Sequence, residues 1–286
     1  MSFGPAGLMV WAVVGRVLRA AADLVLPSRC AACHGPGAPL CGPCADAVRA
    51  AARGVAAGNV DPRPPSVGMP VCLAGARFEG ALRLAVTAYK DEGRRDLRDH
   101  LARLLAGALS AASSDPGVRR RLALGEDVLV VPVPTSRGSR RRRGDDPVGD
   151  LAVAAVAAVN GAGPWASRRA PPGAAPRGTR RGGLVLVPAL LHTRRVADQA
   201  HLDRRARADN LAGAMAVSPA WRPAVAGATC VVVDDVVTTG ATLAEAARAL
   251  LHAGALHVVA ATCASTPRHA LTPALWPTGP PTSVGA

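Results

Sequence analysis

The segment CVVVDDVVTTGATL, from Cys230 to Leu243, constrains the fold of this chain more than any other stretch. It joins an apolar run that ends at Val233, two carboxylates, and a Thr-Thr-Gly loop that leads into a helical pattern from near Thr242. A short β-branched run of this kind, bounded by polar residues and followed by a helix, is typical of a buried strand in a parallel sheet. We therefore expect a strand, a turn and a helix in that order.

The same alternation recurs along the chain. Further apolar runs at 128–131, 184–191 and 257–260 predict strands, and apolar spacing predicts helices at 78–89, 97–109, 148–159 and 242–252. Apolar residues make up 49% of the chain but aromatic residues only 2%, so the core must consist mainly of Ala, Val and Leu. We include three scattered cysteines in that core: Cys72, Cys230 and Cys263. Alternating strands and helices predict an α/β fold, a parallel twisted sheet flanked by helices.

The loop after Val233 has the composition of a phosphate site. In parallel sheets ligands bind beyond the carboxyl ends of the strands, and a helix N-terminus offers unpaired N–H groups and partial positive charge. Glycine lets the backbone approach a ligand closely, and threonine hydroxyls add hydrogen-bond donors. The candidate phosphate-binding residues are Thr238, Thr239, Gly240, Ala241 and Thr242.

The two carboxylates beside this loop suit a different part of a ligand. Asp234 and Asp235 would repel phosphate, but they can accept hydrogen bonds from the hydroxyls of an adjacent sugar. A phosphate-binding loop next to carboxylates that bind two neighbouring sugar hydroxyls predicts a ribose 5-phosphate site. The alternative is a structural turn with capping threonines and two solvated aspartates, which each residue taken alone would also fit.

Four of the seven cysteines form the pattern Cys-x2-Cys-x7-Cys-x2-Cys: Cys30, Cys33, Cys41 and Cys44. Two such pairs have the geometry of a tetrahedral zinc site, and so short a segment would need the metal to fold. Disulfides are the alternative, but they are rare in the reducing cytoplasm, where we expect this chain to reside. The pattern therefore predicts structural Zn2+.

The segment from Val231 to Leu243 resembles the phosphoribosyl-pyrophosphate (PRPP) signature of type I phosphoribosyltransferases. From about Asp23 to Ala264 the chain resembles the ComF family of competence-associated proteins. Beyond the signature and the cysteines, these motifs carry the resemblance: Tyr89-Lys90, Gly93 to Leu97, Val131 to Pro134, Arg143-Gly144, Gln199, Leu202, Arg207, Asn210, Met215 and Ala253 to Ala255. The resemblance implies a type I phosphoribosyltransferase fold with a small N-terminal zinc ribbon.

The resemblance also implies roles for residues. Asp234 and Asp235 would be the catalytic pair that holds the ribose hydroxyls, and Thr238 to Thr242 would hold the 5-phosphate. The loop from Thr135 to Arg140 would face the pyrophosphate, with Arg137 and Arg140 as its ligands. The implied reaction transfers ribose 5-phosphate from PRPP, bound with Mg2+, to an unknown nucleobase-like acceptor and releases pyrophosphate.

Departures from the family pattern bear on catalysis. Asp145, Asp146 and Pro147 stand where the family continues Arg-Gly with Phe-Asn-Gln, and their carboxylates could either bind Mg2+ or repel pyrophosphate. Gly138 and Ser139 stand where the family tends to carry arginine, and His201 where it has glycine. No general base is identifiable; His192 and His201 are candidates by position, although we expect surface histidines there. A non-catalytic PRPP-binding regulator is therefore the first alternative.

The chain has a net charge of +14, and its arginines concentrate at 137–143 and 168–207. Such charge attracts phosphate groups, but solvated loops would have the same composition. A nucleic-acid-binding accessory of DNA uptake is therefore the second alternative, with single-stranded DNA, competence proteins and a second copy of the chain as candidate partners. The charge-dense stretch 195–207 predicts a mobile lid over the ligand.

Composition suggests the domain boundaries. We expect an amphipathic helix plus the cysteine module at 1–56, a linker at 57–77, the phosphoribosyltransferase domain at 78–265, and a disordered proline-rich tail at 266–286. The apolar run near the N-terminus is too short for a membrane span and lacks the features of a signal peptide. These observations predict a cytoplasmic protein without a membrane span.

Overall fold

The computed structural model describes residues 29–53, 59–60, 66–135, 146–161, 182–193 and 213–266. The predicted N-terminal amphipathic helix, the 195–207 lid, Arg137, Arg140, His201 and nearly all of the predicted tail lie outside these residues. No helix within the described part of the chain is long and apolar enough to cross a membrane.

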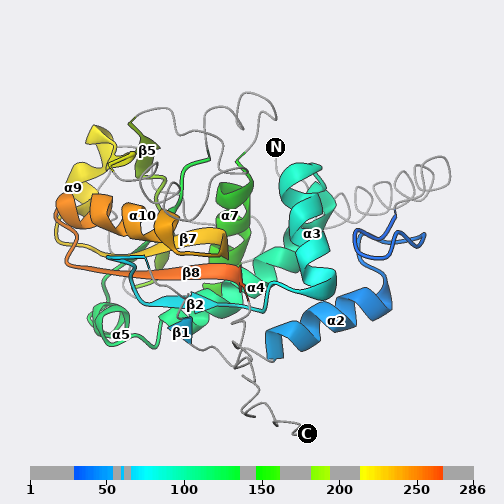
Figure 1. The fold of residues 1–286 in the computed structure, drawn as a ribbon. Helices are drawn as coiled ribbons and strands as arrows, with labels where there is room; N and C mark the ends of the chain where they lie inside the picture. Colours follow the sequence, from blue (N-terminus) through cyan, green and yellow to red (C-terminus); the bar gives the residue numbers. More distant parts are fainter. Residues whose placement is uncertain are drawn as a thin grey trace, which may run out of the picture.

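A six-stranded sheet forms the centre of the molecule (Figure 1). Its order is β1-β2-β8-β7-β3-β4, and all neighbours are parallel except β1, which pairs antiparallel with β2. The strands are β1 (Asn59–Val60), β2 (Cys72–Ala74), β3 (Val128–Pro132), β4 (Leu184–Leu186), β7 (Thr229–Val237) and β8 (His257–Ser265). The five parallel strands confirm the predicted α/β class.

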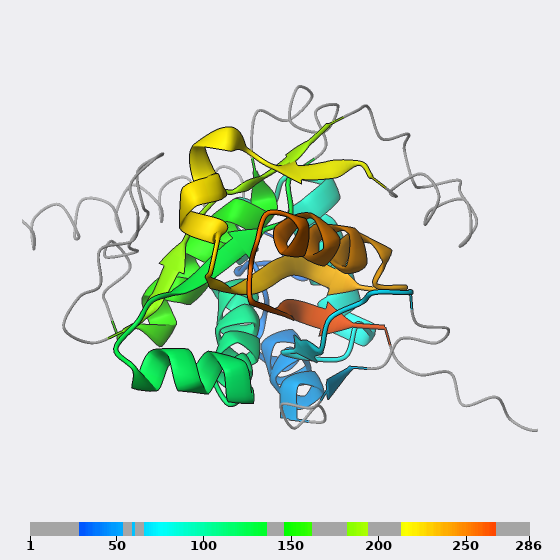
Figure 2. The same ribbon diagram turned by 90° about the vertical axis from the view of Figure 1, so that its left-hand side faces the viewer.

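Helices cover both faces of this sheet. Figure 2 shows α10 (Ala241–His252) over β7 and β8 on one face, whereas α4 (Arg98–Ala112) lies on the other, where it packs against α7 (Pro147–Val159). The crossovers β3–α7–β4 and β7–α10–β8 run in opposite directions, and right-handed crossovers then place their helices on opposite faces. The other helices in the described ranges are α2 (Gly42–Arg53), α3 (Gly80–Asp91), α5 (Pro116–Ala123), α9 (Arg222–Val225) and the 3-10 turns η1 (Arg95–Leu97) and η3 (Pro219–Trp221).

A separate two-stranded antiparallel unit stands above the sheet: β5 (Leu190–His192) and β6 (Met215–Val217). The sequence predicted one strand over 184–191, and this prediction was wrong. The run divides at Val187-Pro188-Ala189 into β4 and β5, which belong to different sheets. Proline has no N–H to donate to a ladder, so the strand cannot continue through Pro188.

The core consists of small aliphatic side chains, as the composition requires. Leu101, Leu105, Val130, Val232 and Leu250 are almost completely buried, and so is the single tyrosine, Tyr89. The three scattered cysteines are buried too, which confirms them as core residues. Burial raises the pKa of the Cys72 and Cys230 thiols to about 12 in each case.

The chain between the cysteines and the large domain takes part in the sheet. Residues 57–77 were predicted as a linker; within them β2 pairs in parallel with β8, with Cys72 opposite Ala260 and Ala74 opposite Thr262. Val71 O accepts a hydrogen bond from Ala260 N at 2.8 Å. Strand β2 therefore has a fixed position next to β8 in the sheet.

Candidate functional site

The site lies at the point where the strand connections change direction. β3 leads outward to β4, and its neighbour β7 leads the other way to β8. Open α/β sheets bind ligands at the carboxyl ends of two such strands. Pro132 is opposite Val233 in this pair, and Val133 N donates to Val233 O at 2.9 Å. The end of β3 therefore lies beside Val233, directly before Asp234 in β7.

Strand β7 is longer than the sequence predicted. It continues past Val233 to Val237, because β8 pairs with it through Asp234, Val236 and Val237. The predicted end at Val233 was wrong, because the run of apolar residues ends there whereas the backbone pairing does not. Successive side chains on a strand point to opposite faces, so the two aspartates cannot share one face.

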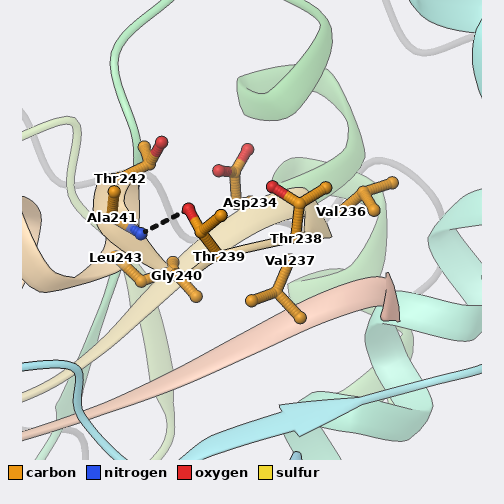
Figure 3. Close-up of a pocket in the computed structure, with 9 residues that line it drawn as sticks. All are labelled: Asp234, Val236, Val237, Thr238, Thr239, Gly240, Ala241, Thr242 and Leu243. Carbon is orange, nitrogen blue, oxygen red and sulfur yellow. Dashed lines mark hydrogen bonds between the residues drawn. The ribbon is translucent and has the colours of Figure 1, made fainter. Parts of the chain in front are cut away.

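Asp234 lines a cavity together with the residues that follow it (Figure 3). The other lining residues are Val236, Val237, Thr238, Thr239, Gly240, Ala241, Thr242 and Leu243. The structure thus brings Asp234 and the whole predicted phosphate loop around one cavity at the N-terminus of α10. Burial, followed by the neighbouring Asp235 charge, raises the pKa of Asp234 well above its ordinary value, although Lys90 opposes this.

The loop has the geometry of an anion site. Gly240 is the N-cap of α10 and has a φ of 79°, a left-handed conformation that side chains disfavour. Figure 3 shows the Thr239 hydroxyl accepting a long hydrogen bond of 3.4 Å from Ala241 N. The first-turn amides of α10 have no acceptor within the helix, so they are available to an anion.

Asp235 faces away from this cavity and is paired. Its carboxylate is buried and lies 2.8 Å from Lys90 Nζ, at the C-terminal end of α3. Burial would lower the pKa of Lys90, but the charges of Asp235 and Asp234 outweigh it and raise that pKa above its ordinary value. Lys90 was part of the resemblance but not among the predicted site residues. Its rarity in the sequence could have identified Lys90, because it is the only lysine in an arginine-rich chain.

Asp146 is one of the residues that depart from the ComF pattern, and it has a structural role in this fold. Asp146 is the N-cap of α7, where its carboxylate accepts hydrogen bonds from Gly149 N at 3.2 Å and from the Thr135 hydroxyl at 2.8 Å. Pro147 occupies the first helical turn, where its missing N–H costs nothing. Asp146 therefore ties Thr135, which follows β3, to the start of α7.

The β5–β6 unit is held over the site from two sides. His192 Nε2 lies 3.0 Å from Pro134 O, next to the start of the same loop. Glu245 on α10 accepts from Met215 N at 2.8 Å, and both of its oxygens are bound by Arg248. Burial opposes ionisation of Glu245, but Arg248 and the backbone amides outweigh it and lower its pKa. We expected His192 at the surface; it is buried, because β5 turns it toward Pro134.

The cysteine module, residues 29–53, forms a second site beside α3 (Figure 1). The sulfurs of Cys30, Cys33, Cys41 and Cys44 all lie within 4.8 Å of one another, and those of Cys33 and Cys41 are 3.5 Å apart. A tetrahedral zinc–thiolate centre places its sulfurs about 3.8 Å apart, so the four thiols fit this ion. The cluster could bind zinc.

The backbone around the cluster supports anionic sulfur. Cys41 N donates to Cys30 Sγ at 3.4 Å. Burial alone would raise the pKa of Cys30, but backbone N–H groups, including those of Cys33 and Cys41, lower it to about 6. Arg94 ties the module to the large domain, because its guanidinium donates to Arg29 O at 2.9 Å while pairing with Asp96.

Comparison with protein families agrees with this geometry. Residues 178–276 match the family model described as the phosphoribosyl transferase domain. No curated protein matches the chain. The matched region includes Asp234 and the loop around the cavity, which supports a function of the phosphoribosyltransferase type. The parallel five-stranded sheet with its flanking helices and this match show that the chain has the phosphoribosyltransferase fold, joined to an N-terminal four-cysteine cluster compatible with a zinc ribbon.

Proposed function

We propose that this protein binds PRPP with Mg2+ and transfers its ribose 5-phosphate unit to a nucleobase-like acceptor, releasing pyrophosphate. The observation that carries the proposal is the cavity at the end of β7, where one carboxylate and a helix N-terminus face the same space. A sugar phosphate needs both features, because its hydroxyls donate hydrogen bonds and its phosphate accepts them.

Each part of the cavity has a role in this proposal. The loop from Thr238 to Thr242 and the first turn of α10 hold the 5-phosphate. Asp234 accepts hydrogen bonds from the ribose hydroxyls. Asp235 acts from the opposite face of the strand, where its pair with Lys90 holds this part of β7 in place. The loop from Thr135 faces the pyrophosphate, with Arg137 and Arg140 in the part outside the described residues.

The reaction breaks the bond between the sugar carbon and the pyrophosphate oxygen and forms a bond from that carbon to the acceptor. Pyrophosphate leaves with the electron pair, and the acceptor nitrogen loses its proton to solvent. Bound Mg2+ supplies charge neutralisation to the leaving group. The protein contributes position and charge, because its loop fixes the phosphate while Asp234 fixes the ribose.

Calorimetry with PRPP and Mg2+ tests the binding step. Replacing Asp234 and Asp235 together by asparagine should weaken PRPP binding more than tenfold, because hydrogen bonds to charged groups are worth about 1.5–3 kcal/mol each. Asp127→Asn is a matched control, since Asp127 is a buried carboxylate at the opposite end of β3 and accepts from Gly183 N. Unchanged PRPP affinity in the double variant would place the site elsewhere.

A PRPP-binding regulator without catalysis is the second candidate. The specific observation in its favour is that Asp234 is the one titratable side chain among the residues described as lining the cavity. Binding requires only the loop and the carboxylate, whereas transfer also requires the acceptor to lose a proton. A screen of nucleobases for pyrophosphate release separates the candidates, because only a transferase releases pyrophosphate in an acceptor-dependent way.

The cysteine module extends the proposal. We propose that Cys30, Cys33, Cys41 and Cys44 hold a structural Zn2+ and that the chain is a ComF-type protein with a role in DNA uptake. The order of a four-cysteine cluster followed by a phosphoribosyl transferase domain supports this. Binding of single-stranded DNA that weakens with salt would support the role in DNA uptake. Its absence at low salt would remove it and leave the transferase proposal intact.

A further inference from the structure

The turn Ser66–Met69 lies behind the phosphate loop, although the two segments are far apart in the sequence. We infer that Ser66 is a positioning residue: its hydroxyl sets the orientation of the Thr239–Gly240 peptide and thereby directs the Gly240 N–H toward the 5-phosphate. This inference rests on the proposed function and adds to it a residue outside the signature segment.

The central contact is a hydrogen bond between a side chain and the backbone. Ser66 Oγ donates to Thr239 O at 2.8 Å, and the contact is partly buried. The turn itself is closed by Met69 N, which donates to Ser66 O at 3.1 Å, and Gly68 supplies its left-handed residue with a φ of 78°. Ser66 therefore reaches Thr239 from a backbone that is itself fixed.

Because the peptide group is planar, this hydrogen bond also fixes the direction of the Gly240 N–H group. In a planar trans peptide the C=O and the following N–H point in opposite directions. Anchoring Thr239 O to Ser66 on one side turns Gly240 N–H to the other side. Gly240 lines the cavity, whereas Ser66 does not, so the anchored carbonyl points toward the turn and the N–H is free to face the ligand. Without the anchor, this glycine peptide could rotate and withdraw its donor, because glycine tolerates most backbone conformations.

Met69 supports the same peptide by packing. A Cβ built on Gly240 would lie 2.1 Å from Met69 Sδ, so the methionine occupies the space directly behind the glycine. Met69 also packs against the core. The turn thus restrains the loop twice, by a hydrogen bond at Thr239 and by contact at Gly240.

The turn is itself attached to the sheet. It leads directly into β2, which pairs with β8, the neighbour of β7. The phosphate loop leaves β7, so the turn and the loop are connected through two adjacent strand pairs. These pairs fix the end of the turn next to β2 relative to β7, so the Ser66 hydroxyl reaches Thr239 from a backbone that is held at that end.

Ser66→Ala tests the inference in the full chain. Loss of one hydrogen bond of net worth about 0.5–1.5 kcal/mol should weaken ribose 5-phosphate and PRPP binding about two- to tenfold. Ser66→Thr keeps the hydroxyl and should restore most of the affinity. Ser113→Ala is the matched control, because the Ser113 hydroxyl also donates to a backbone oxygen, that of Leu109, at 3.1 Å in a partly buried place on α4. It should leave both affinities unchanged.

A second measurement separates positioning from general stability. In wild type, adding ribose 5-phosphate should shift the Gly240 amide signal in nuclear magnetic resonance spectra, and the shift should be smaller in Ser66→Ala. Wild-type affinity and a wild-type Gly240 shift in Ser66→Ala would overturn the inference. If Ser66→Ala unfolds, Ser66→Cys replaces it, because a thiol of similar size is a much weaker donor; a wild-type Gly240 shift in that variant would overturn the inference as well. If wild type binds neither PRPP nor ribose 5-phosphate, it is the proposed function that fails.

Discussion

Lys90 Nζ lies 2.8 Å from the carboxylate of Asp235, and this pair joins the end of α3 to the last part of β7. Half of the Lys90 side chain is exposed, whereas that of Asp235 is buried. The pair therefore neutralises a buried carboxylate, and the charge of Asp234, which lines the cavity, also acts on Lys90.

We predict that Lys90→Met lowers the free energy of unfolding by about 1–3 kcal/mol, because it leaves Asp235 buried without its partner. The partial exposure of Lys90 keeps the cost below that of a fully buried pair. Adding Asp235→Asn to Lys90→Met should recover most of the loss. Urea unfolding of the two variants measures this, and equal stability of both with wild type would show that the pair is not needed for folding.

The same lysine can be labelled selectively. Because Lys90 is the only lysine in the chain, an amine-selective reagent can modify just this side chain and the α-amino group. We expect saturating PRPP and Mg2+ to slow modification of Lys90 but not of the α-amino group, as read by mass spectrometry. Equal rates at Lys90 with and without PRPP would place the ligand away from α3.

Asp234 should make stability depend on pH. Its pKa in the folded chain is raised by burial and by Asp235, so the folded state binds the proton more tightly than the unfolded state. Its contribution is therefore fully present below the unfolded pKa of about 4 and is lost as pH rises through the raised folded value. Asp234→Asn should be more stable than wild type at pH 8.5 and nearly equal at pH 4.5. Chemical denaturation at both pH values measures the difference, and a constant difference would contradict the raised pKa.

Zinc should be tied to the cysteine module alone. We expect about one zinc per chain, by the four-ligand count, and a marked loss in Cys41→Ser with the large domain still folded. Cys230→Ala is the control, since Cys230 is buried in β7 and outside the cluster. Elemental analysis with circular dichroism checks both. Zinc-free wild-type protein with these cysteines in disulfides would refute the metal site.

Gly240 and Met69 should show coupled effects. Gly240→Ala places a side chain at a φ of 79°, at a cost of about 1–2 kcal/mol, and also against Met69 Sδ. Met69→Ala removes the clash with Sδ but not the cost of the left-handed backbone conformation. The double variant should therefore bind PRPP more tightly than Gly240→Ala and more weakly than wild type. Strictly additive losses in a double-mutant cycle would show that Met69 does not press on the loop.

Local patterns determined much of this molecule. The run ending at Val233 and the helix from near Thr242 were predictable, because burial on both faces favours β-branched residues and a glycine-led turn favours a helix start. The cysteine spacing was equally informative, since two close pairs bring four sulfurs together over a short distance. These features depend on neighbours in the sequence, so the loop from Thr238 to Thr242 and the cysteine cluster could be located without the structure.

Tertiary structure decided the features that depend on distant partners. β7 runs on through Asp234 because β8 pairs with it there, and that continuation separates the two aspartates onto opposite faces. The partners of these residues come from other elements: Lys90 from α3 for Asp235, and Ser66 from the turn before β2 for Thr239. His192 is buried because β5 turns it toward Pro134. The sequence by itself determined which residues form the loop; which side chains hold it was decided only when the sheet brought these distant segments together, because hydrogen bonds and ion pairs form between neighbours in space.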